Sequence, residues 1–154
     1  MGIERINELN SLIFDELVQE YEDEFSSVSG KKKNQEGKYS VDVDWRSPNI
    51  GYYWKEDSAI VGFSLIETID GFFEIVDFYV IPAYRGKMIG KNMAFAVFDQ
   101  HPGPWRIRQI SGSQLAAKFW RRVIGEYTNE NFTETQIDNP PWGTSVCQIF
   151  NNQN

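Results

Sequence analysis

The stretch FFEIVDFYVIPAYRGKMIGKNMAFAVFD, from Phe72 to Asp99, decides the fold of this chain. Its β-branched and aromatic start predicts a strand over Phe72–Val80, and its later apolar residues predict a helix over residues 89–98 with Met93, Val97 and Phe98 available for packing. The loop between them contains glycine and the basic residues Arg85 and Lys87, and Lys91 follows in the first turn of the helix. Amides at the first turn of a helix lack intrahelical acceptors, and the helix dipole is positive there, so main chain alone can bind phosphate oxygens. The stretch therefore predicts a site for a phosphorylated cofactor, such as a pyrophosphate ester.

Length and composition indicate one folded domain. The chain has 154 residues, so we expect a single domain over residues 1–154. Hydrophobic residues make up 41% and aromatic residues 15% of the chain, which excludes intrinsic disorder. The single cysteine, Cys147, excludes an intrachain disulfide and a cysteine metal cluster, and we expect no metal. No apolar segment is long enough to span a bilayer and no signal peptide is evident, so we expect no membrane partner and a cytoplasmic setting.

The charge distribution narrows the class of partner. A formal net charge of −7 argues against a nucleic-acid partner, because duplex affinity depends largely on Lys and Arg that neutralise phosphates. Acidic residues concentrate in residues 15–24, and basic residues gather in 31–33 and again in 85–122. This asymmetry fits an anion site in the second half and a negative surface in the first. The alternative is that the acidic run is merely a solvated helix face, which is the usual role of such a run.

The first half of the chain predicts one helix and a hairpin. Leu9, Leu12, Ile13, Leu17 and Tyr21 recur at helical spacing, which predicts an amphipathic helix over residues 8–26. Glycines and a lysine triplet predict an exposed loop over residues 26–40. Two β-rich runs within residues 49–67, separated by a turn at residues 55–58, predict a hairpin.

The second half predicts a parallel crossover and a terminal pair of strands. The turn after His101 stops the preceding helix, and residues 105–110 predict the next strand, so strand, helix and strand form a parallel crossover. Residues 114–124 predict a helix, and residues 132–137 and 145–150 predict two short strands. The apolar face of that helix is expected to carry Leu115, Phe119 and Val123.

Two motifs in this order resemble a known family. The segment YVIPAYRGKMIGKNMAFAVFD resembles the acetyl-CoA motif of the Gcn5-related N-acetyltransferases (GNAT): Gln or Arg, two residues, Gly, one residue, then Gly or Ala. Arg85 and Gly90 fill the ends of this motif, and Met88 stands where its first glycine would be. The segment SQLAAKFWRRVIGEYTNENF resembles the next family motif. Its Asn, Ala and aromatic-pair positions hold Ser113, Ala116 and Phe119-Trp120.

The resemblance covers about residues 60–132, nearly half of the chain, and implies a fold. That fold is an α/β (α+β), GNAT-like three-layer domain. Its central sheet is mixed and mostly antiparallel, with about six to seven strands, one parallel crossover and a splayed centre, and about four helices flank it.

The resemblance also implies acetyl-CoA as cofactor, with CoA as product. Amides from Arg85 to Lys91 would wrap the pyrophosphate, and Gly86 and Gly90 would allow close backbone approach. Main chain of the preceding strand would pair with the pantetheine amides, and one of its N–H groups would act as an oxyanion donor. The implied cofactor-binding residues are Tyr79, Val80, Arg85, Gly86, Lys87, Met88, Ile89, Gly90, Lys91, Ser113, Phe119 and Trp120.

Three residues depart from the family motifs. A left-handed conformation at Met88 would cost about 1 to 2 kcal/mol, so the loop either avoids positive φ there or holds the cofactor less well. Because the amide N–H survives, we favour retained binding. Ser113 is shorter than Asn, so its hydrogen bond to the cofactor is lost or water-mediated. Trp120 stands where many relatives carry the Tyr that protonates the leaving thiolate, which leaves Tyr127, Tyr84 or water as the acid.

Amine acetylation also needs a neutral amine, because an alkylammonium has no lone pair. Glu74 lies eleven residues before Arg85, the position of the base in the histone-acetylating branch of the family, and Asp77 is the other acid on that strand. Burial beside apolar neighbours would suit either carboxylate to proton abstraction. An exposed, solvated Glu74 and a water chain in place of a discrete base are the alternatives. The candidate catalytic residues are Glu74, Asp77 and Tyr127.

Other residues carry weaker hypotheses. His101 is expected to be a loop residue and Cys147 a small core side chain. Asp42 and Asp44 could bind a cationic acceptor. The aromatic residues that could line an acceptor pocket, fill the core or form a homodimer face are Trp45, Tyr52, Tyr53 and Trp54.

The resemblance implies an acetyl-CoA-dependent N-acetyltransferase that transfers the acetyl group directly, in a ternary complex, to a primary amine. The acceptor would be a small molecule or a peptide. A polyamine or an aminoglycoside would match the acidic surface. The alternative is a catalytically weakened CoA-binding or regulatory module, suggested by Met88, Ser113 and Trp120. A third hypothesis is a structural protein whose basic loop contacts an acidic partner.

Overall fold

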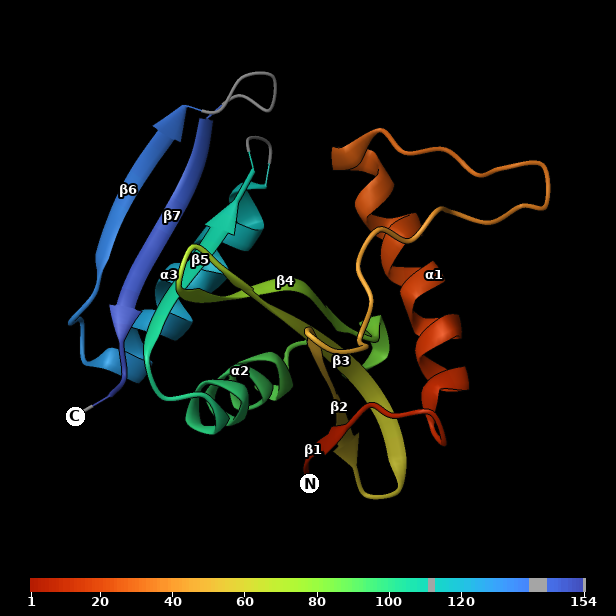
Figure 1. Cartoon of the computed structure of the whole chain (residues 1–154), viewed down its shortest axis with the longest axis horizontal. Coiled ribbons are helices and arrows are strands. Elements are labelled where there is room, and N and C mark those ends of the chain that lie inside the picture. Colours follow the sequence, from red (N-terminus) through yellow and green to blue (C-terminus); the bar gives the residue numbers. More distant parts are fainter. Residues whose placement is uncertain (111–112, 139–143, 154) are drawn as a thin grey trace. The chain divides into compact units, whose positions relative to one another are not determined.

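The computed structural model describes residues 1–110, 113–138 and 144–153, and these residues form a seven-stranded sheet and three α-helices (Figure 1). The strands are β1 (Gly2–Arg5), β2 (Ile50–Glu56), β3 (Ala59–Ile69), β4 (Phe72–Val80), β5 (Pro104–Gln109), β6 (Thr133–Asp138) and β7 (Thr144–Asn151). The helices are α1 (Ser11–Ser29), α2 (Ile89–Gln100) and α3 (Gln114–Thr128), with the short 3-10 helix η1 (Pro82–Tyr84) before α2.

The sheet topology confirms the expected fold class. The strand order is β1-β2-β3-β4-β5-β7-β6. Among the strand pairs whose register is described, β4–β5 is parallel and the others are antiparallel. The predicted crossover through α2 is therefore present. The described residues form three α-helices where about four were expected.

The chain divides into two compact units by its internal contacts. The first unit comprises Met1–Ile66 with Val76–Gly90, and the second comprises Glu67–Ile75 with Lys91–Asn154. The first holds α1, β1 and β2, and the second holds α3, β5, β6 and β7. The single domain expected over residues 1–154 stays a prediction.

The sequence did not predict strand β1. It pairs antiparallel with β2 at the edge of the sheet, with Gly2 opposite Lys55. Its sequence, GIER, is four residues long and half charged. A segment this short carries no readable hydrophobic period, so its pairing could not be inferred from the pattern.

Helix α1 buries a different stripe from the predicted one. Leu17 is buried as expected, but Leu9 is 99% and Leu12 is 78% exposed. The helix begins only at Ser11, so Leu9 lies before it. Its buried face instead starts at Phe14, at the i, i+3, i+4 spacing that continues with Leu17 and Val18.

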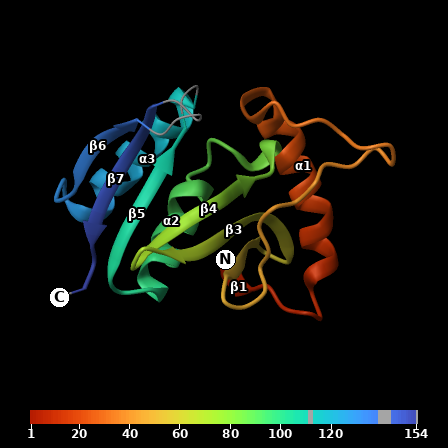
Figure 2. The same ribbon diagram turned by 45° about the horizontal axis from the view of Figure 1, so that its top comes forward.

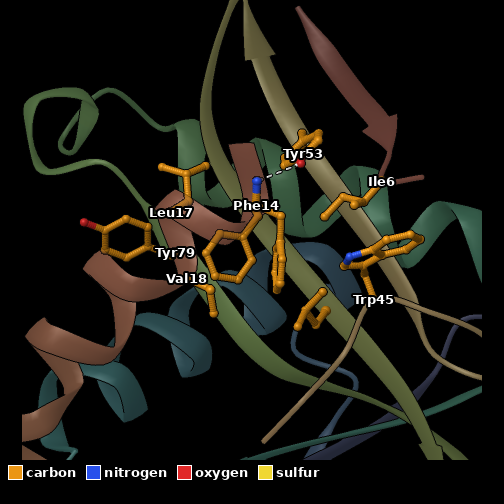
Figure 3. Packing of buried hydrophobic residues seen from close by; sticks show 9 residues of the cluster. Ile6, Phe14, Leu17, Val18, Trp45, Tyr53 and Tyr79 are labelled. Carbon is orange, nitrogen blue, oxygen red and sulfur yellow. Dashed lines mark hydrogen bonds between the residues drawn. The ribbon is translucent and has the colours of Figure 1, made fainter. Parts of the chain in front are cut away.

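The N-terminus of α1 is held by a buried tyrosine of β2. The Tyr53 hydroxyl accepts a hydrogen bond from the Phe14 amide (2.9 Å, dashed in Figure 3) and donates one to the Asn10 carbonyl (2.6 Å). Tyr53 belongs to the core of the first unit, whose buried members are Ile6, Phe14, Leu17, Val18, Trp45, Tyr53, Phe63, Leu65 and Tyr79. All four aromatic residues that were open to three interpretations, Trp45, Tyr52, Tyr53 and Trp54, are buried, which favours the core role.

In the second unit, α3 lies against one face of β5 and β7 (Figure 2), and the unit has an aromatic core. Phe98 of α2 contacts Trp105 of β5 (4.9 Å between ring centroids) and Phe150 of β7 (5.0 Å). Met93, Val97 and Phe98 are fully buried, as predicted for α2. Helix α3 contacts β5 and β7.

The apolar face predicted for α3 is partly wrong. Val123 is buried, but Leu115 in the first turn is 86% exposed. The buried stripe runs instead through Ala117, Trp120 and Ile124. Cys147 is buried as expected, and burial raises the pKa of its thiol.

Candidate functional site

The loop between β4 and α2 has the backbone geometry that a phosphate site needs. β4 ends at Val80, η1 makes one tight turn, and α2 begins at Ile89. Gly86 has φ +79° and Met88 has φ +65°, both in the left-handed region. A Cβ added to Gly86 would meet no atom within 4 Å, so the backbone angle rather than crowding explains the glycine. The first turn of α2 then presents amides that have no intrahelical acceptor.

Met88 adopts the conformation that its side chain disfavours. Of the two alternatives stated for this position, avoidance of positive φ is therefore wrong. The conformation costs an L-residue about 1 to 2 kcal/mol, and the side chain is 60% exposed, so little burial offsets that cost. Such strain persists where the surrounding chain imposes it, and it often marks a functional loop.

The basic residues of this loop are engaged by protein groups to different degrees. Arg85 donates through Nε to the Val80 carbonyl (2.8 Å) and through Nη2 to Glu24 of α1 (2.8 Å). In the second unit, Lys91 pairs with Glu126 (2.9 Å). Lys87 lies over the Tyr84 ring, with 5.3 Å from Nζ to the centroid. The expected cluster of three cations is thus partly neutralised by acids.

Arg85 also links the loop to the strand expected to bind pantetheine. Its guanidinium lies 5.4 Å from the centre of the Tyr79 ring, besides its bond to the Val80 carbonyl. The Ile81 amide donates to the Val61 carbonyl of β3 (2.9 Å), which fixes the end of β4. The Tyr79 side chain lies in the core of the first unit, so the strand could contact a ligand there through its main chain.

The start of α3 holds the remaining cofactor candidates. Ser113 is the N-cap residue of α3, and its side chain makes no capping hydrogen bond there. Phe119 and Trp120 pack edge to face at 5.0 Å, and Trp120 is 7% exposed. The indole therefore serves packing.

Glu74 is buried, as its proposed role requires, but it is not in an apolar setting. The carboxylate is 2% exposed. Oε2 accepts bonds from Nε (3.0 Å) and Nη2 (2.6 Å) of Arg106, and Oε1 accepts one from Nε of Arg108 (2.7 Å). Two predictions for the surroundings of Glu74 are therefore wrong: that its side chain is exposed to solvent, and that only apolar side chains surround it. Proton transfer to this carboxylate would have to disturb a charge-assisted pair.

Asp77 meets a neutral partner instead. It is 8% exposed and receives a hydrogen bond from the Tyr21 hydroxyl of α1. Burial, followed by the Asp77 carboxylate, raises the pKa of Tyr21 well above its ordinary value, so the phenol stays protonated. The Tyr21 ring is fixed between Phe25 (5.7 Å, stacked) and Phe63 (5.9 Å, edge to face).

Tyr127 is a partly buried hydrogen-bonding residue rather than a ready acid. Its hydroxyl donates to Asp99 (2.7 Å) and accepts from Asn152 (3.2 Å). Burial raises the pKa of Tyr127 to about 12; the Asn152 bond lowers it, and the Asp99 bond adds to the rise. Such a phenol is poorly matched to protonating a thiolate near neutral pH.

The acids expected to attract a cationic acceptor are already paired. Lys31 bonds Asp42 (3.0 Å) and Glu22 (2.9 Å), and Arg46 bonds Asp44 (3.0 Å). His101 packs against Phe73 (5.3 Å) in a turn. The described ranges contain no group of three or more His, Cys, Asp or Glu side chains that could hold a metal ion. No helix within those ranges is long and apolar enough to cross a bilayer.

Sequence reasoning missed four residues that shape these sites: Tyr21, Glu24, Arg106 and Arg108. The arginines left a signal, because WRIRQI places two cations at alternate positions of a predicted strand, and hence on one face of the sheet. Tyr21 and Glu24 were read as part of a helix, and nothing in the sequence indicated their partners.

Comparison with known proteins identifies the family. The sequence profile of the acetyltransferase (GNAT) family matches residues 14–125. A search among curated proteins finds no match.

Solved structures with a similar fold include the aminoglycoside 6'-N-acetyltransferase from Enterococcus faecium (TM-score 0.65, 13% identity, covering 100% of this chain and 98% of that chain). A second, from Salmonella typhimurium, is described as an acetyltransferase with its cofactor acetyl-CoA (0.63, 16%, 100% and 95%). A third is the ribosomal-protein-S18-alanine N-acetyltransferase from Escherichia coli (0.62, 12%, 99% and 94%). At these identities the structures show a shared fold, while the profile covers most of the sequence, so the chain belongs to the acetyltransferase (GNAT) family.

Proposed function

We propose that the chain is an acetyl-CoA-dependent N-acetyltransferase. One observation carries the proposal: Met88 is held at φ +65° beside Gly86 at +79°, directly before α2. The loop keeps a costly geometry at the position where the family motif has glycine, and backbone with left-handed residues before a helix is the kind of geometry that binds a diphosphate. Residues 85–91 would bind the diphosphate, and the main chain of Tyr79 and Val80 would bind the pantetheine arm.

The residues present fit such a ligand. The Val80 carbonyl already accepts from Arg85, but a carbonyl oxygen has two lone pairs and can accept a second bond. Lys87 carries its charge without an acidic partner among the described residues, and so can approach a phosphate. The Salmonella typhimurium relative was solved with acetyl-CoA, which supports the same cofactor class here. Ser113, Phe119 and Trp120 remain proposed cofactor neighbours.

Acetyl-CoA supplies the acetyl group as an activated thioester. The acceptor is a primary amine of a small molecule or peptide, which must lose a proton to attack. Asp77 is the better candidate base of the two acids, because its bond comes from a neutral phenol, whereas Glu74 is held by two guanidinium groups. A backbone N–H of β4 would stabilise the developing oxyanion. Water is the simplest proton source for the leaving thiolate, since Tyr127 donates to Asp99.

The structure also gives the alternative some support. Two of the three candidate catalytic residues make structural interactions, because Glu74 is ion-paired and the Tyr127 hydroxyl, with its raised pKa, donates to Asp99. Trp120, at the position of the family's usual acid, is buried. A CoA-binding module without catalysis would show that pattern. A homodimer, a cytoplasmic setting and the absence of a nucleic-acid partner stay predictions.

Two measurements test the proposal. Calorimetric titration with CoA is expected to show binding, and a thiol-release assay with acetyl-CoA and a panel of amines is expected to show turnover. CoA binding without thiol release from any amine would favour the module. No binding at millimolar CoA by a folded sample would contradict both functions.

A further inference from the structure

Strand β5 presents two arginines to one buried carboxylate of β4. The first, Arg106, uses Nε and Nη2 on Glu74, and its Nη2 also lies 3.5 Å from Asp70. The second, Arg108, uses only Nε on Glu74, at 2.7 Å. All four residues belong to the second unit. Two guanidinium groups therefore surround a single buried carboxylate.

The two arginines differ in the exposure of their side chains and in the number of N–H donors that remain free. The Arg106 side chain is 14% exposed, whereas that of Arg108 is 37% exposed. The Nη1 and Nη2 groups of Arg108 make no hydrogen bond to any residue in the described part of the chain. The Nε bond to Glu74 orients the guanidinium plane, so the outer Nη1 and Nη2 donors remain available to a ligand.

The face that carries these arginines lies away from the helices of its unit. Trp105 and Arg106 alternate along β5, and Trp105 contacts Phe98 of α2. On the neighbouring strand β7, Cys147 is the register partner of Arg108 and is itself buried, so no other charged group is provided from that strand position. The strands thus place an oriented guanidinium at an exposed spot.

We infer that Arg108, oriented by Glu74, is a binding site for a carboxylate group. Two parallel N–H donors on a rigid guanidinium match the two oxygens of a carboxylate, which a lysine cannot reproduce. By extension, the acceptor of the proposed acetyl transfer carries a carboxylate besides its amine, as an amino acid does; this extension rests on the proposed function. The paired state of Asp42 and Asp44 favours this zwitterionic acceptor over a polycation.

The competing explanation is that Arg108 is a second counterion that only stabilises Glu74. The two explanations differ in whether Arg108 contributes to binding of an added anion. Arg108→Gln removes the charge and the paired donors, Arg108→Lys keeps a cation near Glu74 without them, and Arg5→Gln removes the same charge from an exposed position on β1.

The direct test titrates each variant with N-acetylglycine and with its amide, followed by NMR chemical shifts and calorimetry, without any turnover. We expect the acid to bind the wild type and Arg5→Gln equally, and Arg108→Gln roughly 10- to 100-fold more weakly. The amide should bind every protein as weakly as the acid binds Arg108→Gln. Equal binding of the acid to wild type and Arg108→Gln, or of acid and amide to wild type, would overturn the site. NMR shifts around Arg108 that respond more strongly to inorganic phosphate than to N-acetylglycine would overturn the carboxylate assignment.

Stability and turnover complete the test. If Arg108→Gln does not fold, Arg108→Lys carries the comparison, with an expected loss of binding of the same sign. In thiol-release assays, amino acids should be acetylated with a higher kcat/KM than their amides. Arg108→Gln should raise the KM of the amino acids and leave the KM of their amides unchanged. Carboxylate binding that depends on Arg108 without turnover would support the site while contradicting the proposed function. Turnover that ignores the acceptor carboxylate would overturn the extension.

Discussion

Met88 is the residue at which backbone geometry and side-chain preference conflict most clearly. Its φ of +65° would suit glycine, and its side chain is 60% exposed. We expect Met88→Gly to raise the free energy of unfolding by about 0.5 to 1.5 kcal/mol, because relief of the left-handed strain exceeds the extra entropy of glycine in the unfolded chain. Urea denaturation followed by circular dichroism measures the change.

The neighbouring Lys87 provides the control. It is not among the residues with positive φ, so Lys87→Gly should lower the free energy of unfolding. CoA affinity of Met88→Gly should stay within about twofold of the wild type, since the amide is retained. A lower free energy of unfolding in Met88→Gly would contradict the claim that the positive φ of Met88 strains the backbone.

At Glu74 the expected consequence of mutation is structural. Glu74→Gln leaves Arg106 and Arg108 without their shared carboxylate, so we expect the free energy of unfolding to fall by about 3 kcal/mol. Glu126→Gln, which breaks the more exposed pair with Lys91, should cost less than about 1 kcal/mol. Denaturant melts of both variants give the comparison.

The same variant tests the base. If Glu74 is structural, the acidic limb of the pH profile of kcat/KM stays in place in Glu74→Gln. Loss of that limb with unchanged stability would instead restore Glu74 as the base.

At the residue scale, the sequence predicted features of the main chain better than contacts between side chains. A local motif predicted that Gly86 and Met88 lie in the loop before a helix, because turn geometry depends on neighbours in sequence. Glu74 was a candidate base from its position eleven residues before Arg85, but its partners lie on β5, and their approach depends on strand pairing that a single sequence does not reveal. The family position therefore suggested catalysis at a residue that forms an ion pair.

Among the elements, α1 depends on a contact outside its own sequence. The Tyr53 hydroxyl satisfies one amide and one carbonyl at the start of the helix, and it is buried. Tyr53→Phe should lower the free energy of unfolding by about 1 to 3 kcal/mol, because both groups lose their partner where water is excluded. Tyr84→Phe is the matched control, since its hydroxyl makes no hydrogen bond within the described residues.

Thermal and urea unfolding measure both variants. Equal stability of Tyr53→Phe and wild type would mean that water replaces the hydroxyl.

The sequence predicted which helices and strands exist more reliably than which face of each helix is buried. The strand, loop and helix of residues 72–100 follow from strong local patterns, and the packing residues of α2 were correct. In α1 and α3 several apolar residues compete for the core, and the larger side chains Phe14 and Trp120 determine the buried stripe, which leaves Leu12 and Leu115 exposed. A hydrophobic period predicts that a helix forms, but it predicts less well how the helix is rotated about its own axis and so which residues are buried.

At the scale of the whole molecule, the sequence predicted a mixed sheet with one parallel crossover. It could not predict which side chains meet across β4 and β5, because those contacts join residues about 30 positions apart. The loop between β4 and α2 was therefore foreseen, whereas the arginine pair emerged only with the fold.

Each compact unit contains a tyrosine whose neutral form the fold protects, so alkaline pH should destabilise the whole chain. Tyr53 of the first unit is fully buried and Tyr127 of the second is partly buried. Burial raises the pKa of Tyr53 in the first unit and of Tyr127 in the second to about 12, from about 10 in the unfolded chain. Their contribution to stability is complete below pH 10 and is lost as the pH rises toward 12, because the unfolded chain releases these protons first. Urea midpoints measured from pH 8 to 12 should fall above pH 10, and Tyr53→Phe should fall less steeply than wild type. A midpoint that stays constant to pH 12 would contradict the protected phenols.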